Sequence, residues 1–216
     1  MYDLISEKVA AFFTQYHHQE YTKGELLIRA GDDPVGIFYL KKGLVKQYAI
    51  SKKGDELVIN VFKPISFFPM SWAISSILNE YFFEALEPVE VWIAPKDKVV
   101  EFVKSNPDVL YSLVDRVYHG TSGLLSRMIY LMSGSAYPKL IIELIIQAKR
   151  FGKVGKDGSS YQLTINERDI AAQSGMTRET VSRELKTLKD KKLVTFDKTI
   201  LTIINIGLLE EELASY

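Results

Sequence analysis

The sequence predicts an α+β chain in which an N-terminal antiparallel β domain is followed by a long helix and a C-terminal winged helix-turn-helix domain. Three observations support this prediction. Short β-rich runs punctuated by glycine fill about the first hundred residues, a heptad repeat of apolar residues follows Pro107, and two short helical periods flank Gly175 ahead of a β-hairpin pattern. We therefore expect three segments, at residues 1–104, 105–134 and 135–216.

The N-terminal segment has the pattern of a small antiparallel barrel or sandwich. Runs rich in β-branched and aromatic residues alternate with glycines, which suit the turns between short strands. The glycines in question are Gly24, Gly31, Gly43 and Gly54. The expected strands are Glu25–Ile28, Gly36–Leu40, Leu44–Ile50 and Glu56–Phe62.

From Pro107 onward the pattern predicts one long helix with an apolar seam. Its residues are spaced alternately four and three apart, which is the heptad spacing of coiled coils. We expect the seam to form a dimer interface made by Leu110, Val114, Val117, Thr121, Leu124, Met128 and Leu131. A second apolar stripe, expected to face the chain's own β domain, contains Val109, Leu113, Leu125, Ile129 and Met132. A helix buried inside a monomer is the alternative explanation of the two stripes.

The long helix is expected to end at Gly134, which places the junction between the domains near residues 133–137. A further helix is expected from Tyr137 to about Arg150, with a loop from Phe151 to Ser160.

The segment around Gly175 predicts two short helices joined by a tight turn. Gly175 suits the turn because a residue without a Cβ adopts positive φ at little steric cost. Asn166 and Thr177 each precede a helical run, and their side-chain oxygens can cap the first amides of those helices. The second helix has an apolar face made by Val181, Leu185 and Leu188.

The opposite face of that second helix carries side chains suited to duplex DNA. An arginine can donate two hydrogen bonds to guanine O6 and N7, and a glutamate can accept one from cytosine N4, whereas lysines are suited to phosphates. The predicted DNA contacts are Thr177, Arg178, Glu179, Thr180, Ser182, Arg183, Lys186 and Lys189. Two β-rich runs, Leu193–Phe196 and Ile200–Ile203, follow as a predicted wing. An amphipathic helix pair with a solvated charged face is the alternative.

Charge is distributed in agreement with this function. The formal net charge is +0, but residues 135–205 hold 13 Lys and Arg against 8 Asp and Glu, a net of +5. Residues 1–134 hold 14 against 16, a net of −2. Phosphate attraction is local because salt screens it over about 10 Å at 0.1 M, so the positive segment counts for more than the total.

Other functional classes find little support in the sequence. It has no cysteine, which excludes disulfides, thiol catalysis and cysteine-ligated clusters, and it contains no P-loop, GxGxxG, GxSxG or HExxH motif. The histidines His17, His18 and His119 lack partners at metal-ligand spacing. No signal peptide or membrane span is apparent. We expect a cytoplasmic protein that is not an enzyme, with no cofactor, no metal and no membrane partner.

Two stretches resemble the Crp/Fnr family of bacterial transcription regulators. GMTRETVSRELKTLKDKKLVTFDKTILTI is similar to the family's winged helix-turn-helix, and AGDDPVGIFYLKKGLVKQY resembles its β-roll. The resemblance implies a double-stranded β-helix (β-roll, jelly-roll-like) as sensor, a homodimer, a palindromic operator and RNA polymerase as a further partner. Glu179, Ser182 and Arg183 match the Fnr-branch trio for a TTGA-like half-site, and Arg178 matches a Crp-branch contact on TGTGA. A sensory protein whose C-terminal domain contacts protein is the alternative function.

The family's cyclic AMP site is not matched. Members that sense cyclic AMP carry a Gly-Glu start and an Arg-Ser or Arg-Ala pair, but this chain has no arginine between Arg29 and Arg116. The Thr-Ser pair that touches the nucleotide falls at Leu124-Leu125. We therefore expect cyclic AMP not to bind in the family's usual way.

Aromatic residues replace the cyclic AMP cassette, and two explanations remain open. Either they fill the β-roll core, or they line an apolar pocket for an unidentified small-molecule effector. The pocket candidates are Phe67, Phe68, Met70, Trp72, Tyr81, Phe82, Leu124 and Leu125. Haem sensing also occurs in the family, and the three histidines are the candidates to ligate its iron.

Overall fold

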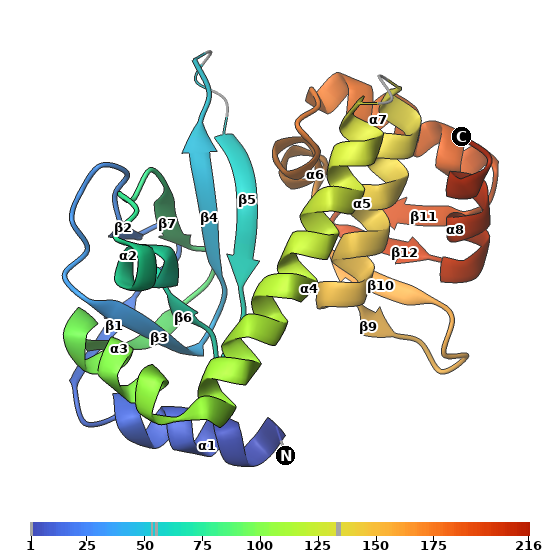
Figure 1. The fold of residues 1–216 in the computed structure, drawn as a ribbon. Helices are drawn as coiled ribbons and strands as arrows, with labels where there is room; N and C mark the ends of the chain where they lie inside the picture. The colour runs from blue at the N-terminus through green and yellow to red at the C-terminus, as the bar shows by residue number, and fades with distance from the viewer. Residues whose placement is uncertain (1, 53, 55, 133–134) are drawn as a thin grey trace. The chain divides into compact units, whose positions relative to one another are not determined.

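The computed structural model describes residues 2–52, 54, 56–132 and 135–216, without the side chains at 2, 3, 126, 127 and 130–132. Two predicted residues of the long helix, Leu131 and Met132, therefore lie outside the described side chains, and the predicted helix end at Gly134 lies outside the described residues. The chain divides into two compact units, Met1–Val117 and Tyr118–Tyr216 (Figure 1). The division falls inside one helix, α4 (Pro107–Met132), so the predicted boundaries at 104 and 134 remain predictions.

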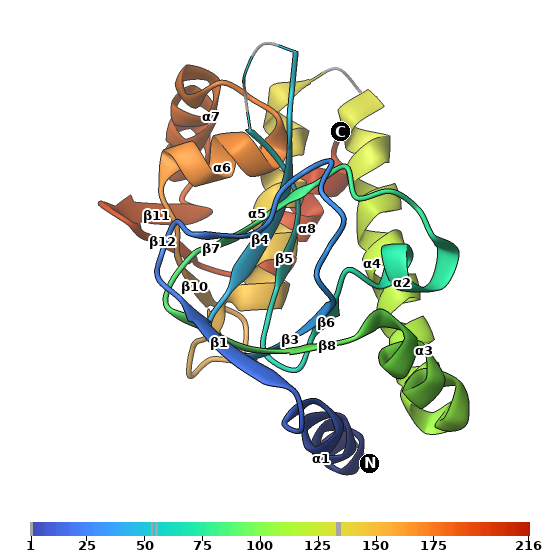
Figure 2. The same cartoon turned by 90° about the vertical axis from the view of Figure 1, so that its left-hand side faces the viewer.

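The first unit contains two four-stranded antiparallel sheets, with strand orders β1-β8-β3-β6 and β2-β7-β4-β5 (Figure 2). Strands β1 to β4 pair with β8, β7, β6 and β5 respectively, and consecutive strands alternate between the two sheets except at β4–β5 and are thus arranged as a jelly roll, which confirms the predicted fold class. The strands are β1 (His17–Tyr21), β2 (Leu26–Ile28), β3 (Ile37–Lys42), β4 (Val45–Ile50), β5 (Glu56–Phe62), β6 (Phe67–Phe68), β7 (Phe82–Ala85) and β8 (Val89–Ala94).

The four strands expected from the sequence agree with β2 to β5 to within two residues at each end. The prediction missed β1, β6, β7 and β8, together with the helices α1 (Tyr2–Phe13), α2 (Met70–Ser75) and α3 (Lys96–Ser105). Strand β6 has only two residues, too few to show an alternation, and is held in place by pairing with β3.

Two cores form on the two faces of the first sheet. Between the sheets, Phe68 stacks on Phe83 with ring centroids 5.1 Å apart, and the ring of Phe62 lies 4.5 Å from that of Phe68. On the outer face, α1, α3 and the start of α4 cover the sheet, and Phe67 is buried there. Neighbouring residues of a strand point to opposite faces, so the adjacent Phe67 and Phe68 contribute to different cores.

Helix α4 confirms the single long helix expected after Pro107. Its first turn is attached to the β domain because Val109 is buried in the outer core and Asp108 pairs with Lys8 of α1 at 3.0 Å. The ion pair with Lys8 lowers the pKa of the Asp108 carboxyl below its usual value.

The second unit contains the helices α5 to α8 and a small antiparallel sheet of order β11-β12-β10-β9. Its elements are α5 (Ala136–Phe151), β9 (Lys153–Val154), β10 (Tyr161–Thr164), α6 (Glu167–Ser174), α7 (Arg178–Asp190), β11 (Val194–Asp197), β12 (Ile200–Ile203) and α8 (Ile206–Ala214). The predicted apolar face of α7 is buried, with Val181, Leu185 and Leu188 each at most 1% exposed. These residues pack with the apolar face of α5 in one core.

The predicted wing hairpin of β11 and β12 is confirmed, and β12 also pairs with β10 over Tyr161–Thr164. Other features of this unit were not expected from the sequence. The predicted loop 151–160 contains the short strand β9, and α8 was not predicted. Strand β10 pairs with residues 36 to 42 positions away on β12, which a local pattern does not contain, and β9 has only two residues, too few to show an alternation.

Candidate DNA-binding site

The turn between α6 and α7 is built by local signals that the sequence carries. Gly175 ends α6 in the left-handed region at φ 65° and ψ 28°, where a side chain is disfavoured. Thr177 then caps α7 because its side-chain oxygen accepts a hydrogen bond from the amide of Thr180 at 3.2 Å. Asn166 caps α6 in the same way through the amide of Asp169 at 2.9 Å. The predicted turn and both predicted caps are confirmed.

The structure places the predicted contact residues together on the outer side of α7. Six of them are exposed on the helix, and Thr177 is exposed at its cap. The six are Arg178, Glu179, Ser182, Arg183, Lys186 and Lys189. Thr180 is only half-buried, and its hydroxyl lies 3.0 Å from that of Thr177. Thr180 therefore contributes to the helix cap, while its contact with DNA stays a prediction.

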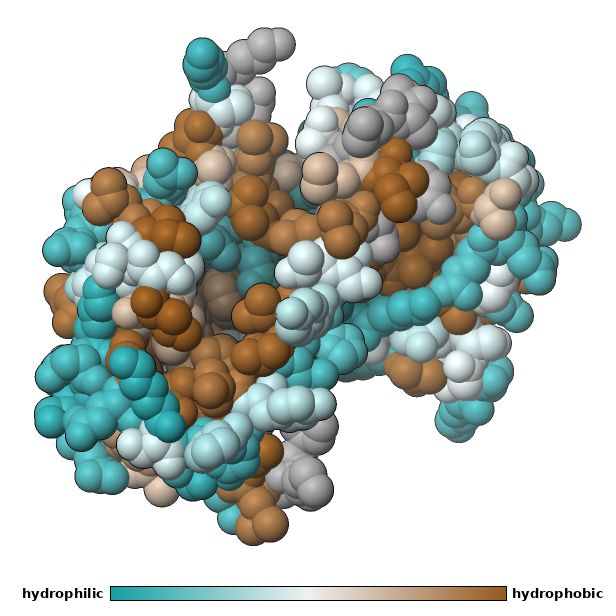
Figure 3. Space-filling model, viewed as in Figure 1, coloured by the Kyte–Doolittle hydropathy of each residue, from teal (hydrophilic) through white to brown (hydrophobic). Residues whose placement is uncertain are grey.

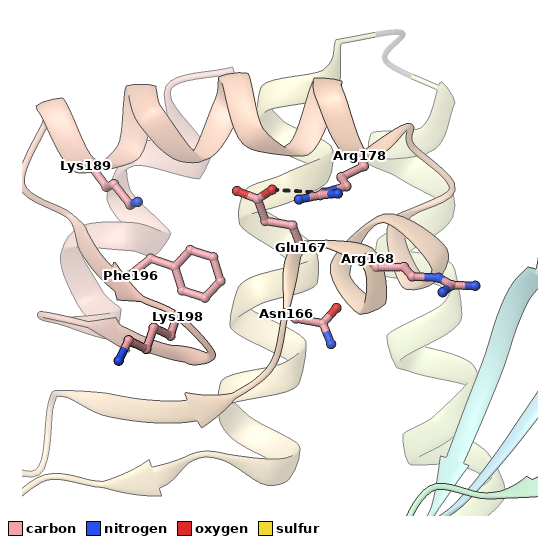
Figure 4. A pocket seen from close by; sticks show the side chains of 7 residues that line it. All are labelled: Asn166, Glu167, Arg168, Arg178, Lys189, Phe196 and Lys198. Carbon is pink, nitrogen blue, oxygen red and sulfur yellow. Dashed lines mark hydrogen bonds and ion pairs between the residues drawn. The ribbon is translucent and has the colours of Figure 1, made fainter. Parts of the chain in front are cut away.

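A hollow of about 550 Å³ lies beside α7 and brings three elements together (Figure 4). Asn166, Glu167 and Arg168 come from the start of α6, Arg178 and Lys189 from α7, and Phe196 and Lys198 from the wing. Four cationic side chains thus share the hollow with one carboxylate. Arg168 and Lys198 were not predicted as site residues, although the position of Lys198 in the polar turn of the predicted wing was a usable signal.

The aromatic residue that lines the hollow, Phe196, contacts one of the cations, Lys189. The Lys189 ammonium lies 5.3 Å from the centroid of the Phe196 ring, within the range of a cation–π contact. Lys198 occupies the turn of the wing at φ 52°. In Figure 4 both lysines lie on the left side of the view, above and below the Phe196 ring.

Both arginines expected to recognise bases have carboxylate partners. Arg178 Nε lies 3.5 Å from Glu167 Oε2 of α6, and the two side chains point toward one another in Figure 4. Arg183 Nε and Nη2 donate to Glu184 Oε1 at 3.0 and 2.9 Å. The arginine side chains are 71% and 68% exposed, so solvent and ligands reach them.

Lys191, at the end of α7, has a structural partner in α8. Its ammonium pairs with the Glu212 carboxylate at 2.5 Å, and this pair lowers the pKa of Glu212 and raises that of Lys191. Burial, together with the same carboxylate, raises the pKa of Tyr137 to about 12. The missed helix α8 therefore fixes the end of α7 through a polar cluster.

The predicted effector residues of the β domain are distributed over several environments. Phe67 and Phe68 are buried in different cores, and Met70 and Trp72 pack against the outer one. Trp72 Nε1 donates to Asp33 Oδ1 at 3.0 Å, and the Lys96 ammonium lies 4.5 Å from its ring.

The remaining candidates for the effector pocket are Tyr81 and Phe82 of the β domain and Leu124 and Leu125 of α4. Tyr81 packs against the core between the sheets, and Phe82 stacks on Tyr48 with centroids 5.2 Å apart. Leu124 and Leu125 of α4 are 45% and 56% exposed. A common effector pocket for these residues remains a prediction.

The arginine nearest in sequence to the unmatched cassette is Arg116 on α4. Its Nη1 donates to the carbonyl of Ile65 at 2.8 Å, in the loop between β5 and β6. Ile65 has a φ of 72°, which is strained for a β-branched residue. The guanidinium of Arg116 is thus engaged in supporting that loop.

The predicted dimer seam is exposed wherever its side chains are described. Leu110, Val114, Val117, Leu124 and Met128 are between 40% and 58% exposed, and Thr121 is exposed as well. Apolar surface along α4 is visible in Figure 3. Such a row of exposed apolar side chains is typical of an interface rather than of a solvated helix.

The second predicted stripe separates into two parts. Val109 is 1% exposed in the outer core of the β domain and Leu113 packs against it, whereas Leu125 and Ile129 are 56% and 66% exposed. Val109 and Leu113 therefore contact the β domain as expected, whereas the contact expected for Leu125 and Ile129 remains a prediction.

None of the described helices combines the length and the hydrophobicity that a membrane-spanning helix requires. Among the residues that the structure describes, no group of three His, Cys, Asp or Glu side chains is placed to hold a metal ion.

Both units match known domain families. Residues 18–106 match the cyclic nucleotide-binding domain, and residues 139–212 match the Crp-like helix-turn-helix domain. A chain with this pair of domains is a transcription regulator with a DNA-binding helix-turn-helix. The chain belongs to the Crp/Fnr family.

Relatives and solved structures span nearly the same length. The chain is 26% identical over 191 residues to the global nitrogen regulator of Nostoc sp., which covers 86% of this chain and 84% of that protein. A mutant of CooA from Carboxydothermus hydrogenoformans has a TM-score of 0.78 at 19% identity, covering 94% of this chain and 90% of that one. A CRP/FNR-family regulator from Thermus thermophilus has a TM-score of 0.73 at 19% identity, covering 93% and 99%. At these identities the structural likeness supports the fold alone.

Proposed function

We propose that this regulator acts as a homodimer that inserts α7 into the major groove of a palindromic operator with TGA-containing half-sites. The observation that carries the proposal is the exposed polar face of α7 beside a hollow lined by cations from α6, α7 and the wing. Base edges and phosphates require different side chains, and this surface offers both kinds next to one another.

Base recognition is assigned to the exposed side chains near the start of α7. Arg183 donates to guanine O6 and N7, and Glu179 accepts from N4 of the cytosine paired with it. Arg178 and Ser182 provide additional base contacts, as the resemblance to the two family branches implies. Thr177, Thr180, Lys186 and Lys189 contact the DNA backbone, together with Arg168 and Lys198 of the hollow.

Dimerisation is assigned to the seam of α4. The exposed apolar row on this helix is supported by the heptad spacing of its residues, which suits pairing with a second copy of the same helix. A two-fold dimer would place its two α7 helices on half-sites about one helical turn, roughly 34 Å, apart. RNA polymerase is the further protein partner in this proposal.

Control of the regulator is assigned to a small-molecule effector other than cyclic AMP. The phenylalanine rings of Phe62, Phe68 and Phe83 stack in the space between the two sheets of the β domain. Arg116 donates to a backbone carbonyl and the preceding arginine in sequence is Arg29, so the cassette region offers no planar two-pronged donor for a phosphate.

Titration of the purified protein with cyclic AMP in a calorimeter should therefore produce no saturable heat. Binding of an operator duplex by the same preparation serves as the control for a folded, active protein. Saturable binding of cyclic AMP at micromolar concentrations would show that this part of the proposal is wrong.

Replacing Lys189 with alanine should weaken binding to all duplexes alike. A lysine that contacts phosphate neutralises backbone charge without distinguishing bases, so the slope of log affinity against log salt should fall by about 1. Lys149→Ala, on α5 and paired with Glu210, is the matched control and should leave the slope unchanged. A change of base preference in Lys189→Ala would contradict the assignment to phosphate.

Selection of bound duplexes from a random pool, followed by affinity measurements across salt concentrations, tests the function as a whole. We expect enrichment of one palindrome with TGA half-sites and a steep fall of affinity with salt. If no sequence is enriched and salt has little effect, the C-terminal unit contacts protein instead of DNA.

A further inference from the structure

The contact between Arg183 and Glu184 is not a consequence of helix periodicity. Adjacent helical residues do not face each other, because each residue turns the helix by about 100°. Nevertheless, Arg183 Nε and Nη2 both donate to Glu184 Oε1, at 3.0 and 2.9 Å. Both side chains must turn toward one another to make this pair.

The pair uses only one edge of the guanidinium. Arginine has five N–H donors, and the edge formed by Nε and Nη2 takes the carboxylate. The other edge, formed by Nη1 and the second hydrogen of Nη2, retains two nearly parallel donors. That is the geometry which matches guanine O6 and N7, so one arginine can hold the carboxylate and the base simultaneously.

Exposure indicates which partner is fixed. The side chain of Glu184 is 14% exposed, whereas that of Arg183 is 68% exposed. Glu184 lies at the edge of the buried face of α7, close to Leu185, which is 1% exposed. A sheltered carboxylate therefore restrains the outer part of a long and otherwise mobile side chain.

The second arginine of the surface is held differently. Arg178 has one longer contact, 3.5 Å from its Nε to Glu167 Oε2, and this carboxylate belongs to α6 rather than to α7. One contact at this length restrains orientation much less than two short ones to the same oxygen. The restraint is therefore strongest at the residue assigned to the TGA guanine.

We propose that Glu184 is a positioning residue for base recognition, which holds one edge of Arg183 so that the other meets guanine. The proposal rests on the proposed function, since it requires that Arg183 contacts a base. Glu184 itself does not touch DNA. Its effect is a lower ordering cost when Arg183 binds guanine, because the side chain is already oriented.

The negative charge of Glu184 and its role in positioning Arg183 predict different effects on DNA binding when Glu184 is replaced, and this difference makes the proposal testable. Removing a carboxylate close to DNA should by itself strengthen binding to every duplex. Loss of positioning should instead reduce the preference for the guanine-containing operator over the same duplex with that base pair replaced. The ratio of the two affinities separates these effects, because a uniform electrostatic change cancels in it.

The test compares Glu184→Met and Glu184→Gln with the wild type. Methionine keeps the length of the half-buried side chain but provides no oxygen, and we expect it to lower the guanine preference about fivefold to tenfold, part of what a bidentate contact provides. Glutamine retains an oxygen acceptor for Arg183 and should restore most of the preference. Asp190→Asn removes one negative charge from an exposed position of α7 and should leave the ratio unchanged.

Each outcome decides between the explanations, provided that thermal melting shows each variant to be folded. If methionine does not pack at this position, Glu184→Ala replaces it. A guanine preference that stays within about twofold of wild type would overturn the proposal, and a gain of affinity for both duplexes would then identify Glu184 as a source of electrostatic repulsion only. A rise of the guanine preference would also overturn it, because it would identify Glu184 as a competitor for Arg183. A wild-type protein without any guanine preference would refute the proposed function instead.

Discussion

Replacing Arg183 with alanine should cost about 1–3 kcal/mol of operator binding and remove the preference for guanine at one position of each half-site. The side chain is 68% exposed, so its loss creates no cavity and the fold should remain intact. The loss should be confined to one base pair, because an end-on contact to O6 and N7 involves a single guanine. Affinities for the operator and for a duplex with that pair exchanged measure the effect.

Arg168→Ala is the matched control for this variant. Arg168 is an exposed arginine on α6 that lines the hollow, and the proposal assigns it to phosphate. The Arg168→Ala variant should weaken binding to the operator and binding to the exchanged duplex by the same factor. If Arg183→Ala behaves like Arg168→Ala, with base preference unchanged, then Arg183 contacts the backbone and the docking of α7 is wrong.

Introducing glutamate at both Leu124 and Met128 should convert the proposed dimer into a monomer. These side chains are 45% and 54% exposed in the single chain and would be buried against a second copy. Burial of four unpaired carboxylates at a two-fold interface is strongly unfavourable. Sedimentation should show a monomer, and palindrome affinity should fall by about 10²–10⁴-fold, since the two half-sites no longer bind as a linked pair.

Ser122→Glu provides the control for the seam. Ser122 is exposed on the same helix, but its position in the heptad lies away from the seam residues. This variant should remain dimeric and bind the palindrome as the wild type does. A double variant at Leu124 and Met128 that stays dimeric would place the interface elsewhere on the chain.

The sequence predicted those features that depend on residues close together in the chain. Gly175, Asn166 and Thr177 determine a turn and two caps over a few positions, and all three are observed as predicted. Likewise, the three-to-four residue spacing of Val181, Leu185 and Leu188 is sufficient to identify the buried face of α7. The exposed face follows from the same periodicity.

The sequence was less informative where strands pair over long distances. Strand β7 pairs with residues of β4 that lie 34 to 40 positions away, and β8 pairs with residues of β3 that lie 48 to 57 positions away. Phe67 and Phe68 entered a single set of pocket candidates, although the pleat of β6 directs them into different cores. The alternation of a strand would have separated them had this two-residue strand been recognised.

Local patterns in the sequence predicted a small antiparallel barrel or sandwich, the winged helix-turn-helix and the polar face of α7, and the resemblance of two stretches to the Crp/Fnr family supplied the family and the jelly-roll topology. The three-dimensional fold was needed to learn which residues meet in the hollow, since Glu167, Arg178, Phe196 and Lys198 come from three separate elements. It was needed also for the pairing of Arg183 with Glu184, although the two are neighbours in sequence. That pairing depends on side-chain conformation and on the shelter given to Glu184, and neither is contained in the spacing of residues.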